Sequence, residues 1–384
     1  MNYFRCWRCN DCGEDYALDE VRYLCPACSR DYKPGMPLPG VLEGIFEYVK
    51  IGNEWDFEPD LGKFEILDRS YYPPLPVGNT PFFLAERLAA ELCLPKLYIK
   101  FDGLNPSGSL KDRASELVVA DANRLGIREI VCASTGNAAS SLACLCAAAG
   151  KKAVIFAPAS APAAKLAQIR VHGAELHAVK GSYDDAFAAA LEYSQSHECL
   201  CRNTAYNPLT IEGKKSAGFE IWRQLGSVPD WIVVPVGDGV ILAGIFKAYW
   251  DLFNCGIIDN MPKLLAVQAS SSDAITSYWE TGVYRDAADP VTIADSISVR
   301  TPANAHGAVW ALKTTEGKAV RVYDDAILRD QKELARKTGV FAEPSSAATL
   351  SGLLAGIENE WIKQEDKVVL LVTGHGLKDI DAVN

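Results

Sequence analysis

The chain has 384 residues, of which 49% are hydrophobic, and it carries a formal net charge of -11. This length allows a large core in two domains, and the acidity argues against nucleic acid or an anionic membrane as a partner. Residues 1–30 contain no apolar run that would serve as a secretory signal, and no stretch is long enough to span a bilayer. We therefore expect a cytoplasmic protein whose twelve cysteines are metal ligands or buried thiols.

Four cysteines near the amino end have the spacing of a zinc ribbon. Cys9 and Cys12 form one Cys-x2-Cys pair, and Cys25 and Cys28 form a second pair after twelve intervening residues. Two such pairs supply four thiolates to one tetrahedral ion, a closed arrangement that leaves no position for a substrate. The spacing predicts a structural zinc ribbon over residues 1–36, with Cys6 as a spare thiol. A set of buried free thiols is the alternative.

Beyond a proline-rich connector, strands and helices alternate along the chain. Buried-type strands are predicted at residues 97–100, 130–132, 153–156, 175–179, 231–236, 264–267 and 368–372. The alternation is typical of α/β proteins with doubly wound open sheets. We expect two such domains, at residues 37–205 and 206–384, with a ligand site in the cleft between them.

The segment that says most about chemistry is Asn-Pro-Ser-Gly-Ser-Leu-Lys-Asp-Arg at residues 105–113. Its Asn-Pro and Gly predict a tight turn into an apolar-periodic stretch, so Lys111 is expected at a helix N-terminus, where the pKa of an amine falls. An unprotonated lysine amine can carry an aldehyde cofactor as a Schiff base. For an isolated Lys-Asp-Arg run, a solvent-exposed helix start would be the alternative.

Three later segments each place polar groups at the end of a predicted strand. The turn at residues 134–138 precedes an alanine-rich helix, and its amides would suit a carboxylate. The turn at residues 237–241 could cradle a phosphate in the same way. Thr373 leaves a hydroxyl at the carboxyl edge of the sheet, where open α/β sheets bind ligands.

Together these motifs resemble those of the fold-type II pyridoxal phosphate enzymes, the tryptophan synthase β-like group. Within that group the chain is most similar to threonine synthases, from about Gly78 to Asp379. The motifs that carry the resemblance, in the order of the family, are Gly78–Pro81, the Lys111 segment, Ser134–Asn137, Asn207–Lys215, Ala342–Ala348 and Thr373–Asp379.

The resemblance implies a role for each motif. Lys111 would form the Schiff base with pyridoxal phosphate and carry the proton between Cα and the leaving group. Asn137 would donate to the phenolic oxygen of the cofactor, and Thr373 would meet the pyridine nitrogen. The substrate would be bound by Ser134, Thr135, Gly136, Asn137 and Ala138. The cofactor phosphate would be bound, in the C-terminal domain, by Gly237, Asp238, Gly239, Val240 and Ile241.

Three positions depart from the threonine synthase pattern. Ala205, Thr210 and Ala138 stand where the family has serine, arginine and threonine, which help to hold the phosphate of O-phosphohomoserine. A hydrogen bond to a charged group contributes roughly 1.5–3 kcal/mol, so the loss of three would cost on the order of 5 kcal/mol or more unless Lys214 or Lys215 compensates. Asp238 also brings a carboxylate to the phosphate loop. Either it turns outward to pair with a lysine, or the loop changes its path.

The expected function is a lyase that acts on a small amino acid, with no nucleic acid or membrane partner. Because a hydroxyl at Thr373 does not force protonation of the cofactor's ring nitrogen, elimination chemistry is favoured. The conversion of O-phosphohomoserine to threonine and phosphate is the first hypothesis. The alternative is a β-eliminating or β-replacing enzyme, such as a threonine or serine dehydratase, an ammonia-lyase, or a cysteate or cysteine synthase. Residues 292–297, Thr-Ile-Ala-Asp-Ser-Ile, resemble dehydratases and favour that alternative. A further alternative is an inactive homologue that binds the cofactor without turnover. We also expect the protein to form a homodimer.

Overall fold

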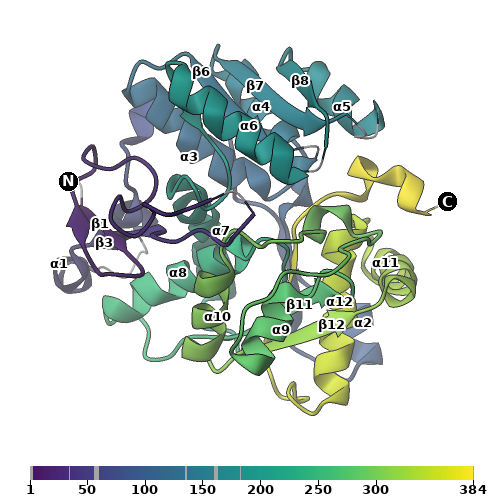
Figure 1. Ribbon diagram of the computed structural model, residues 1–384. Helices are drawn as coiled ribbons and strands as arrows, with labels where there is room; N and C mark the ends of the chain where they lie inside the picture. The colour runs from purple at the N-terminus through teal and green to yellow at the C-terminus, as the bar shows by residue number, and fades with distance from the viewer. Residues whose placement is uncertain are drawn as a thin grey trace.

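A computed structural model describes residues 3–33, 35–55, 60–134, 136–159, 163–181 and 183–383. Within these ranges the strands form three sheets (Figure 1). The first is antiparallel and comprises β1 (Phe4–Cys9), β2 (Asp15–Tyr16) and β3 (Leu42–Phe46), in the order β2-β1-β3. Helix α1 (Tyr48–Asn53) follows it. Because β3 pairs with β1 as far as Phe46, the ribbon extends past the predicted limit at residue 36, and that boundary is wrong.

The second sheet lies at the top of Figure 1 and is parallel, with strand order β8-β7-β6-β9. Its strands are β6 (Glu129–Ala133), β7 (Lys152–Pro158), β8 (Glu175–Val179) and β9 (Cys199–Cys201). The associated helices are α3 (Lys111–Arg124), α4 (Asn137–Ala148), α5 (Ala163–Arg170) and α6 (Tyr183–Ser196). The central strands are continuous apolar runs because helices bury both faces of the sheet.

The third sheet has six strands in the order β12-β11-β10-β13-β5-β4. They are β4 (Phe82–Leu84), β5 (Leu97–Phe101), β10 (Trp231–Pro235), β11 (Lys263–Ala269), β12 (Lys318–Val322) and β13 (Val368–Val372). All neighbours are parallel except β4 and β5. The remaining α-helices are α2 (Glu86–Glu91), α7 (Leu209–Leu225), α8 (Val240–Asn254), α9 (Ala274–Thr281), α10 (Ala305–Thr314), α11 (Asp324–Thr338) and α12 (Pro344–Glu358).

The predicted α/β class with two open sheets is confirmed, but the predicted division at residue 205 does not separate the sheets. β4 and β5 precede the second sheet in the chain and yet belong to the third, where Leu97–Phe101 pairs with Val368–Val372. The chain therefore crosses between the sheets just before Lys111. The described residues also include short 3-10 helices. Among them are η1 (Leu61–Phe64), η2 (Arg69–Tyr71), η3 (Asp102–Leu104), η4 (Asp295–Ile297) and η5 (Gly376–Lys378).

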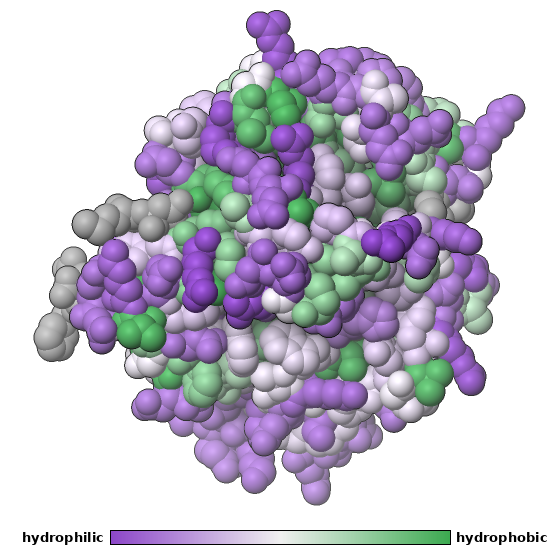
Figure 2. Space-filling view, turned by 60° about the vertical axis from the view of Figure 1, so that its left-hand side comes forward, coloured by the Kyte–Doolittle hydropathy of each residue, from purple (hydrophilic) through white to green (hydrophobic). Residues whose placement is uncertain are grey.

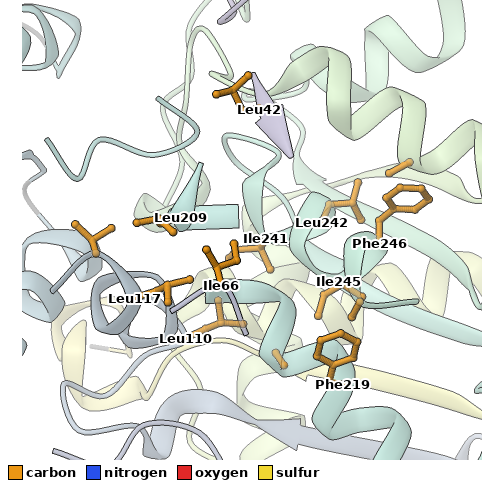
Figure 3. Packing of buried hydrophobic residues seen from close by; sticks show 14 of the residues in the cluster. Leu42, Ile66, Leu110, Leu117, Leu209, Phe219, Ile241, Leu242, Ile245 and Phe246 are labelled. Atoms are coloured by element: carbon orange, nitrogen blue, oxygen red, sulfur yellow. The ribbon is translucent and has the colours of Figure 1, made fainter. Parts of the chain in front are cut away.

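One apolar cluster joins the ribbon to the helices that carry the loops of both larger sheets (Figure 3). Leu42 comes from β3, Leu117 from α3, Phe219 from α7 and Phe246 from α8. Helices α3 and α7 are in backbone contact, since a Cβ at Gly213 would lie 2.2 Å from the carbonyl oxygen of Arg113. Any displacement of α7 would therefore move α3 with it.

The surface is predominantly polar. Figure 2 shows hydrophilic side chains over most of one face, with apolar ones in small groups between them. None of the helices in the described ranges has the length and apolar character needed to cross a bilayer.

A buried ion-pair network fixes the start of α3. The guanidinium of Arg113 donates to both carboxylate oxygens of Asp102, at 2.6 and 2.9 Å, and to both of Glu220, at 2.7 and 2.8 Å. Lys100 also donates to Glu220, at 2.5 Å. Burial alone would raise the pKa of Glu220, but the two cations outweigh it and hold the pKa at about 2. Arg113 is thus a structural residue that ties η3, α3 and α7 together.

We predict that Arg113→Met lowers the free energy of unfolding by about 3–5 kcal/mol, because it leaves buried carboxylates without their partner. Chemical denaturation would measure the loss. Arg336→Met is the control: that side chain is 69% exposed and pairs with Glu333, which is itself 36% exposed, so a change within about 0.5 kcal/mol is expected. Equal stability of the two variants would contradict the assigned role of Arg113.

Candidate active site

Lys111 lies at the junction of the two larger sheets. It is the first residue of α3, and the preceding loop is attached to the carboxyl end of β13. The amide of Leu110 donates to the carbonyl oxygen of Thr373 at 2.8 Å, and Ser109 forms a β-bridge with Gly374. The predicted helix start at Lys111 is therefore present, and both sides of the crossover hold it in place.

The lysine lines a cavity of about 490 Å³. Of the residues predicted to form the site, the cavity wall brings together Lys111, Ser134, Gly136, Asn137, Ala138 and Asp238. A smaller adjoining cavity brings Thr373 and Ile241 next to Lys111. Thr135 lies outside the described residues. The ends of β6, β10 and β13 thus meet around one lysine.

Burial lowers the pKa of Lys111, and the positive charge of Arg202 lowers it further. The carboxylates of Asp238 and Glu343 act in the opposite direction without reversing the shift. A lowered pKa leaves more of the amine unprotonated near neutral pH, which is the form that attacks an aldehyde.

The turn between β6 and α4 presents backbone amides to the cavity. The amide of Gly136 donates to Ser134 Oγ at 3.2 Å, and α4 begins at Asn137. The first amides of a helix have no partner within the helix, so they suit an anion such as a carboxylate.

Asn137 is itself held by Glu343, a site residue to which the sequence analysis gave no role. Asn137 Nδ2 donates to the two carboxylate oxygens of Glu343 at 3.0 and 2.9 Å, and to Ser296 Oγ at 3.1 Å. Burial raises the pKa of Glu343, while the bond from Asn137 and the charges of Lys378 and Lys111 act in the opposite direction. The only sequence signal for Glu343 was its place in the Ala342–Ala348 motif.

The turn between β10 and α8 packs closely against later segments of the chain. Gly239 has φ of 83°, and a Cβ there would lie 2.7 Å from the carbonyl oxygen of Asn304. A Cβ at Gly237 would lie 2.9 Å from Ile297 Cα. Only glycine fits these two positions. The buried Val240 begins α8 directly after the turn.

Asp238 lines the cavity, so of the two expected arrangements the outward turn does not occur. Its Oδ1 accepts a hydrogen bond from the amide of Val240 at 3.0 Å. Burial would raise its pKa, but the charges of Lys214 and Lys111 lower it overall. The carboxylate is therefore paired with lysine charge inside the site, and the loop keeps its position at the start of α8.

Thr373 lies next to a second hydroxyl. Its Oγ1 is 2.8 Å from Ser346 Oγ, which also accepts from the amide of Gly374 at 2.8 Å. Thr373 therefore places a neutral hydroxyl at the end of β13, and the resemblance predicts that this hydroxyl meets the pyridine nitrogen.

This arrangement fits pyridoxal phosphate. An amine of lowered pKa, two helix N-termini and a neutral hydroxyl surround two adjoining cavities. Helix N-termini bind phosphate and carboxylate groups through their unpaired amides.

The three departures from the family pattern do not reach into the cavity with polar groups. Thr210 Oγ1 accepts from the amide of Ala205 at 3.0 Å and donates to the carbonyl oxygen of Asn207 at 2.8 Å, so it closes its own turn. Ala138 lines the cavity without a polar side chain.

The two lysines considered as compensation differ in position. Lys215 forms ion pairs with Glu212 at 2.6 Å and Asp251 at 3.0 Å, away from the cavity wall. Lys214 is fully buried and donates to Thr204 Oγ1 at 3.3 Å, beside Asp238. Burial lowers the pKa of Lys214 well below its ordinary value. Of the two, Lys214 is the one near the site.

Arg202 is a cavity residue that the sequence analysis missed. It follows the short strand β9 and is fully buried. No local pattern marks a lone arginine after a cysteine-rich strand, so the sequence carried no signal for it.

The segment with the dehydratase-like sequence also borders the cavity. Asp295 and Ser296 of η4 line it, and Ser296 contacts both Asn137 and Glu343. His375 accepts from the amide of Leu377 at 3.1 Å and caps η5, which is a turn role.

The sulfur atoms of Cys9, Cys12, Cys25 and Cys28 all lie within 4.8 Å of one another. Cys9 and Cys28 are 3.8 Å apart, and Cys12 and Cys25 are 3.7 Å apart. Four sulfurs at the usual distance of about 2.3 Å from a zinc ion would be about 3.8 Å apart at the corners of a tetrahedron. The cluster therefore has the dimensions of a four-thiolate zinc site, and Cys6 is not part of it.

Comparison with known proteins identifies the family of the chain. Residues 74–374 match the model of the family described as pyridoxal-phosphate dependent enzyme. The threonine synthase of Methanocaldococcus jannaschii is 37% identical over 98% of this chain and 93% of its own length. That of Methanosarcina acetivorans is 36% identical over the same shares of the two chains.

Solved structures share the fold. Threonine deaminase isoform 2 from Solanum lycopersicum superposes with a TM-score of 0.67 at 24% identity, over 77% of this chain and 78% of the other. The L-serine ammonia-lyase of Rhizomucor miehei superposes with a TM-score of 0.69 at 20% identity, over 80% and 96%. At these identities the likeness shows the α/β architecture and no more.

We predict that the apoprotein attaches pyridoxal at a pH well below the ordinary lysine pKa of about 10.4, because the pKa of Lys111 is lowered. Asp238→Asn should move the pH profile to still lower values, since it removes a negative charge that raises this pKa. Visible absorbance of the lysine-bound aldehyde reports the reaction, and pyridoxal without a phosphate keeps the phosphate loop out of the measurement. Asp259→Asn at the surface is the control, and identical profiles for the two variants would contradict the prediction.

Proposed function

This chain belongs to the threonine synthase family of pyridoxal phosphate-dependent enzymes and is a lyase, and from that premise we propose that it converts O-phosphohomoserine to L-threonine and phosphate. The observation that carries the proposal is the position of Lys111, whose amine of lowered pKa lies between the starts of α4 and α8 in one cavity. The similarity to threonine synthases over 98% of the chain supports the choice of substrate.

Each wall of the cavity has one task in this proposal. Pyridoxal phosphate, when bound, withdraws electrons from the substrate so that a proton can leave Cα. Lys111 Nζ holds the cofactor's aldehyde at rest and moves the proton during turnover. The amides at the start of α4 and Ser134 orient the substrate carboxylate. Asn137, held by Glu343, and Thr373 orient the cofactor ring.

The phosphate of the cofactor would occupy the turn at Gly237–Ile241. Glycine at 237 and 239 lets this turn pack against Ile297 and Asn304, and the N-terminus of α8 favours an anion. Asp238 opposes a second negative charge there, and Lys214 and Lys111 offset it. The cavity walls would exclude water from the reacting carbon, which limits hydrolysis of reactive groups.

One observation favours a second candidate, a β-eliminating or β-replacing lyase. Ala138, Ala205 and Thr210 provide no polar contact to the cavity, although the family uses the side chains at these positions to hold the substrate phosphate. The contact of Ser296 with Asn137 also brings the dehydratase-like segment into the site. The choice between the two candidates therefore depends on the leaving group.

We further propose that the cysteine cluster binds one structural zinc ion, on the basis of its sulfur spacing. All twelve cysteines are free thiols, which fits a reducing compartment and a cytoplasmic location. The homodimer stays a prediction that sedimentation analysis would check.

We predict that the cofactor-loaded protein forms threonine and inorganic phosphate in equal amounts from O-phosphohomoserine, and that Lys111→Ala abolishes this activity. L-threonine, L-serine and O-phospho-L-serine should be run beside it with keto acid as the readout. Lys332→Ala, an exposed lysine of α11, is the matched control and should keep full activity. Keto acid from a β-substituted amino acid, with no threonine from O-phosphohomoserine, would instead support the second candidate.

We predict about one zinc ion per chain in the purified protein. Cys12→Ser should release it and lower the stability by several kcal/mol, because a metal-bound ribbon has little apolar core of its own. Cys93→Ser is the matched control, since Cys93 is also an exposed free thiol and lies outside the cluster. Elemental analysis and thermal denaturation measure the two effects. A metal-free wild type of unchanged stability would refute the zinc proposal.

A further inference from the structure

Arg202 is a buried cation whose charged end has no partner in the described structure. The side chain is 0% exposed, and neither Nη1 nor Nη2 has a hydrogen-bond partner among the described residues. Its Nε donates to Ser115 Oγ at 3.1 Å, and its amide donates to the carbonyl oxygen of Val131 at 2.8 Å. The Nε end of the guanidinium is therefore held in place, while the Nη1 and Nη2 end borders the cavity of Lys111.

A buried charge without a partner is costly, and proteins keep one where a ligand will pair with it. The nearby carboxylate of Asp238 does not fill this role, because Arg202 makes no hydrogen bond to it. Asp238 instead lies beside Lys214 and Lys111. The cavity wall also carries Asp289, Asp295 and Arg300, and within the described residues no carboxylate accepts a hydrogen bond from Arg202 Nη1 or Nη2.

Arg202 lies in the sheet that carries the expected carboxylate site, while Thr204 and Lys214 beside it also interact with Asp238 of the phosphate loop. Arg202 follows β9, which pairs with β6, and the turn after β6 is the expected carboxylate site. Asn203 Oδ1 accepts from the amide of Ala133 at 2.8 Å and so fastens the two strand ends together. The expected site of the cofactor phosphate follows β10 in the other sheet.

We propose that Arg202, backed by Lys214 and Thr204, binds an anionic group on the side chain of the substrate, and that this group is a phosphate monoester. The proposal rests on the proposed function. The fork of a guanidinium matches two oxygens of a phosphate, and such charge-assisted pairs are strong and directional. Both Arg202 and Thr204 line the cavity, and Lys214 lies behind its wall, where it donates to Thr204 Oγ1.

This subsite replaces the one that the chain lacks. The side chains that hold the substrate phosphate in the family are absent at Ala138, Ala205 and Thr210, and the two unpaired nitrogens of Arg202 supply donors from a different position. An amino acid with a neutral side chain, such as L-serine or L-threonine, would leave Arg202 unpaired when the cavity closes around it. Such substrates should therefore be disfavoured.

The first test uses no turnover. The cofactor-loaded wild type is heated with and without inorganic phosphate in a phosphate-free buffer, and we expect phosphate to raise the melting temperature because it binds only the folded protein. Arg202→Met should lose this shift. Arg128→Met removes an exposed arginine next to β6 and should keep it. A phosphate-induced shift of equal size in Arg202→Met would overturn the proposal.

The second test separates the substrate from the cofactor. Arg202→Met should raise the KM for O-phosphohomoserine by about 100-fold, the value expected for two lost bonds to a charged group. Its cofactor content and visible spectrum should stay unchanged, and Arg202→Lys should recover part of the loss. Weaker cofactor binding at unchanged KM would overturn the proposal, because Arg202 would then serve the cofactor phosphate.

Failure of the proposed function would look different. If the wild type formed no threonine from O-phosphohomoserine but its phosphate-induced melting shift still depended on Arg202, the subsite would stand and the reaction would be reassigned. O-phospho-L-serine would then be the substrate whose KM rises in Arg202→Met. If the wild type made threonine and Arg202→Met left both the melting shift and the KM unchanged, only the subsite would be refuted.

Discussion

The chemistry of this protein depends on the buried guanidinium of Arg113, which lies two residues after Lys111 in the chain. The guanidinium binds Asp102, which follows β5, and Glu220, which lies on α7. It therefore fixes α3 to the six-stranded sheet and to α7 at once. The bond from Leu110 to Thr373 fixes the same helix end to β13. With the start of α3 held from three directions, the Lys111 amine can stay buried and keep a low pKa.

What the sequence predicts well is local. The Asn-Pro-Ser-Gly turn and the apolar period after it locate Lys111 at a helix start, and continuous apolar runs locate β6, β10 and β13. What it does not predict depends on contacts between distant segments. β5 belongs to the sheet of β13, more than 260 residues later, and no local pattern encodes that pairing. The bond between Asn137 and Glu343 and the burial of Arg202 likewise arise only when the two sheets meet.

The ribbon is coupled to the site through buried polar contacts. The amide of Gly44 in β3 donates to Glu212 at 3.0 Å, two residues before Lys214. Glu212 and Asp251 in turn bind Lys215, and Asp251 also binds Lys247 of α8. The ribbon therefore rests on α7 and α8, whose first turns carry the residues around Lys214 and the phosphate loop. A metal that orders the ribbon would stabilise this support, which gives a closed zinc site a role without direct catalysis.

The balance of charge in the cavity explains why the unusual residues occur together. A carboxylate at Asp238 would repel the cofactor phosphate if it stood alone, and Lys214 offsets it from behind the cavity wall. Because Lys214 and Lys111 compensate Asp238, the outer fork of Arg202 stays available. Of the family's three side chains at positions 138, 205 and 210, serine and threonine are neutral and arginine is charged, whereas in this chain the charge is carried by the buried Arg202. A buried arginine without a bound ligand has a free-energy cost, so it can serve as a phosphate site only where neighbouring groups reduce that cost. For Arg202 these groups are Ser115, which accepts from Nε, and the nearby carboxylate of Asp238. The loss of the family's serine, arginine and threonine and the presence of Asp238, Lys214 and Arg202 are thus parts of one electrostatic arrangement.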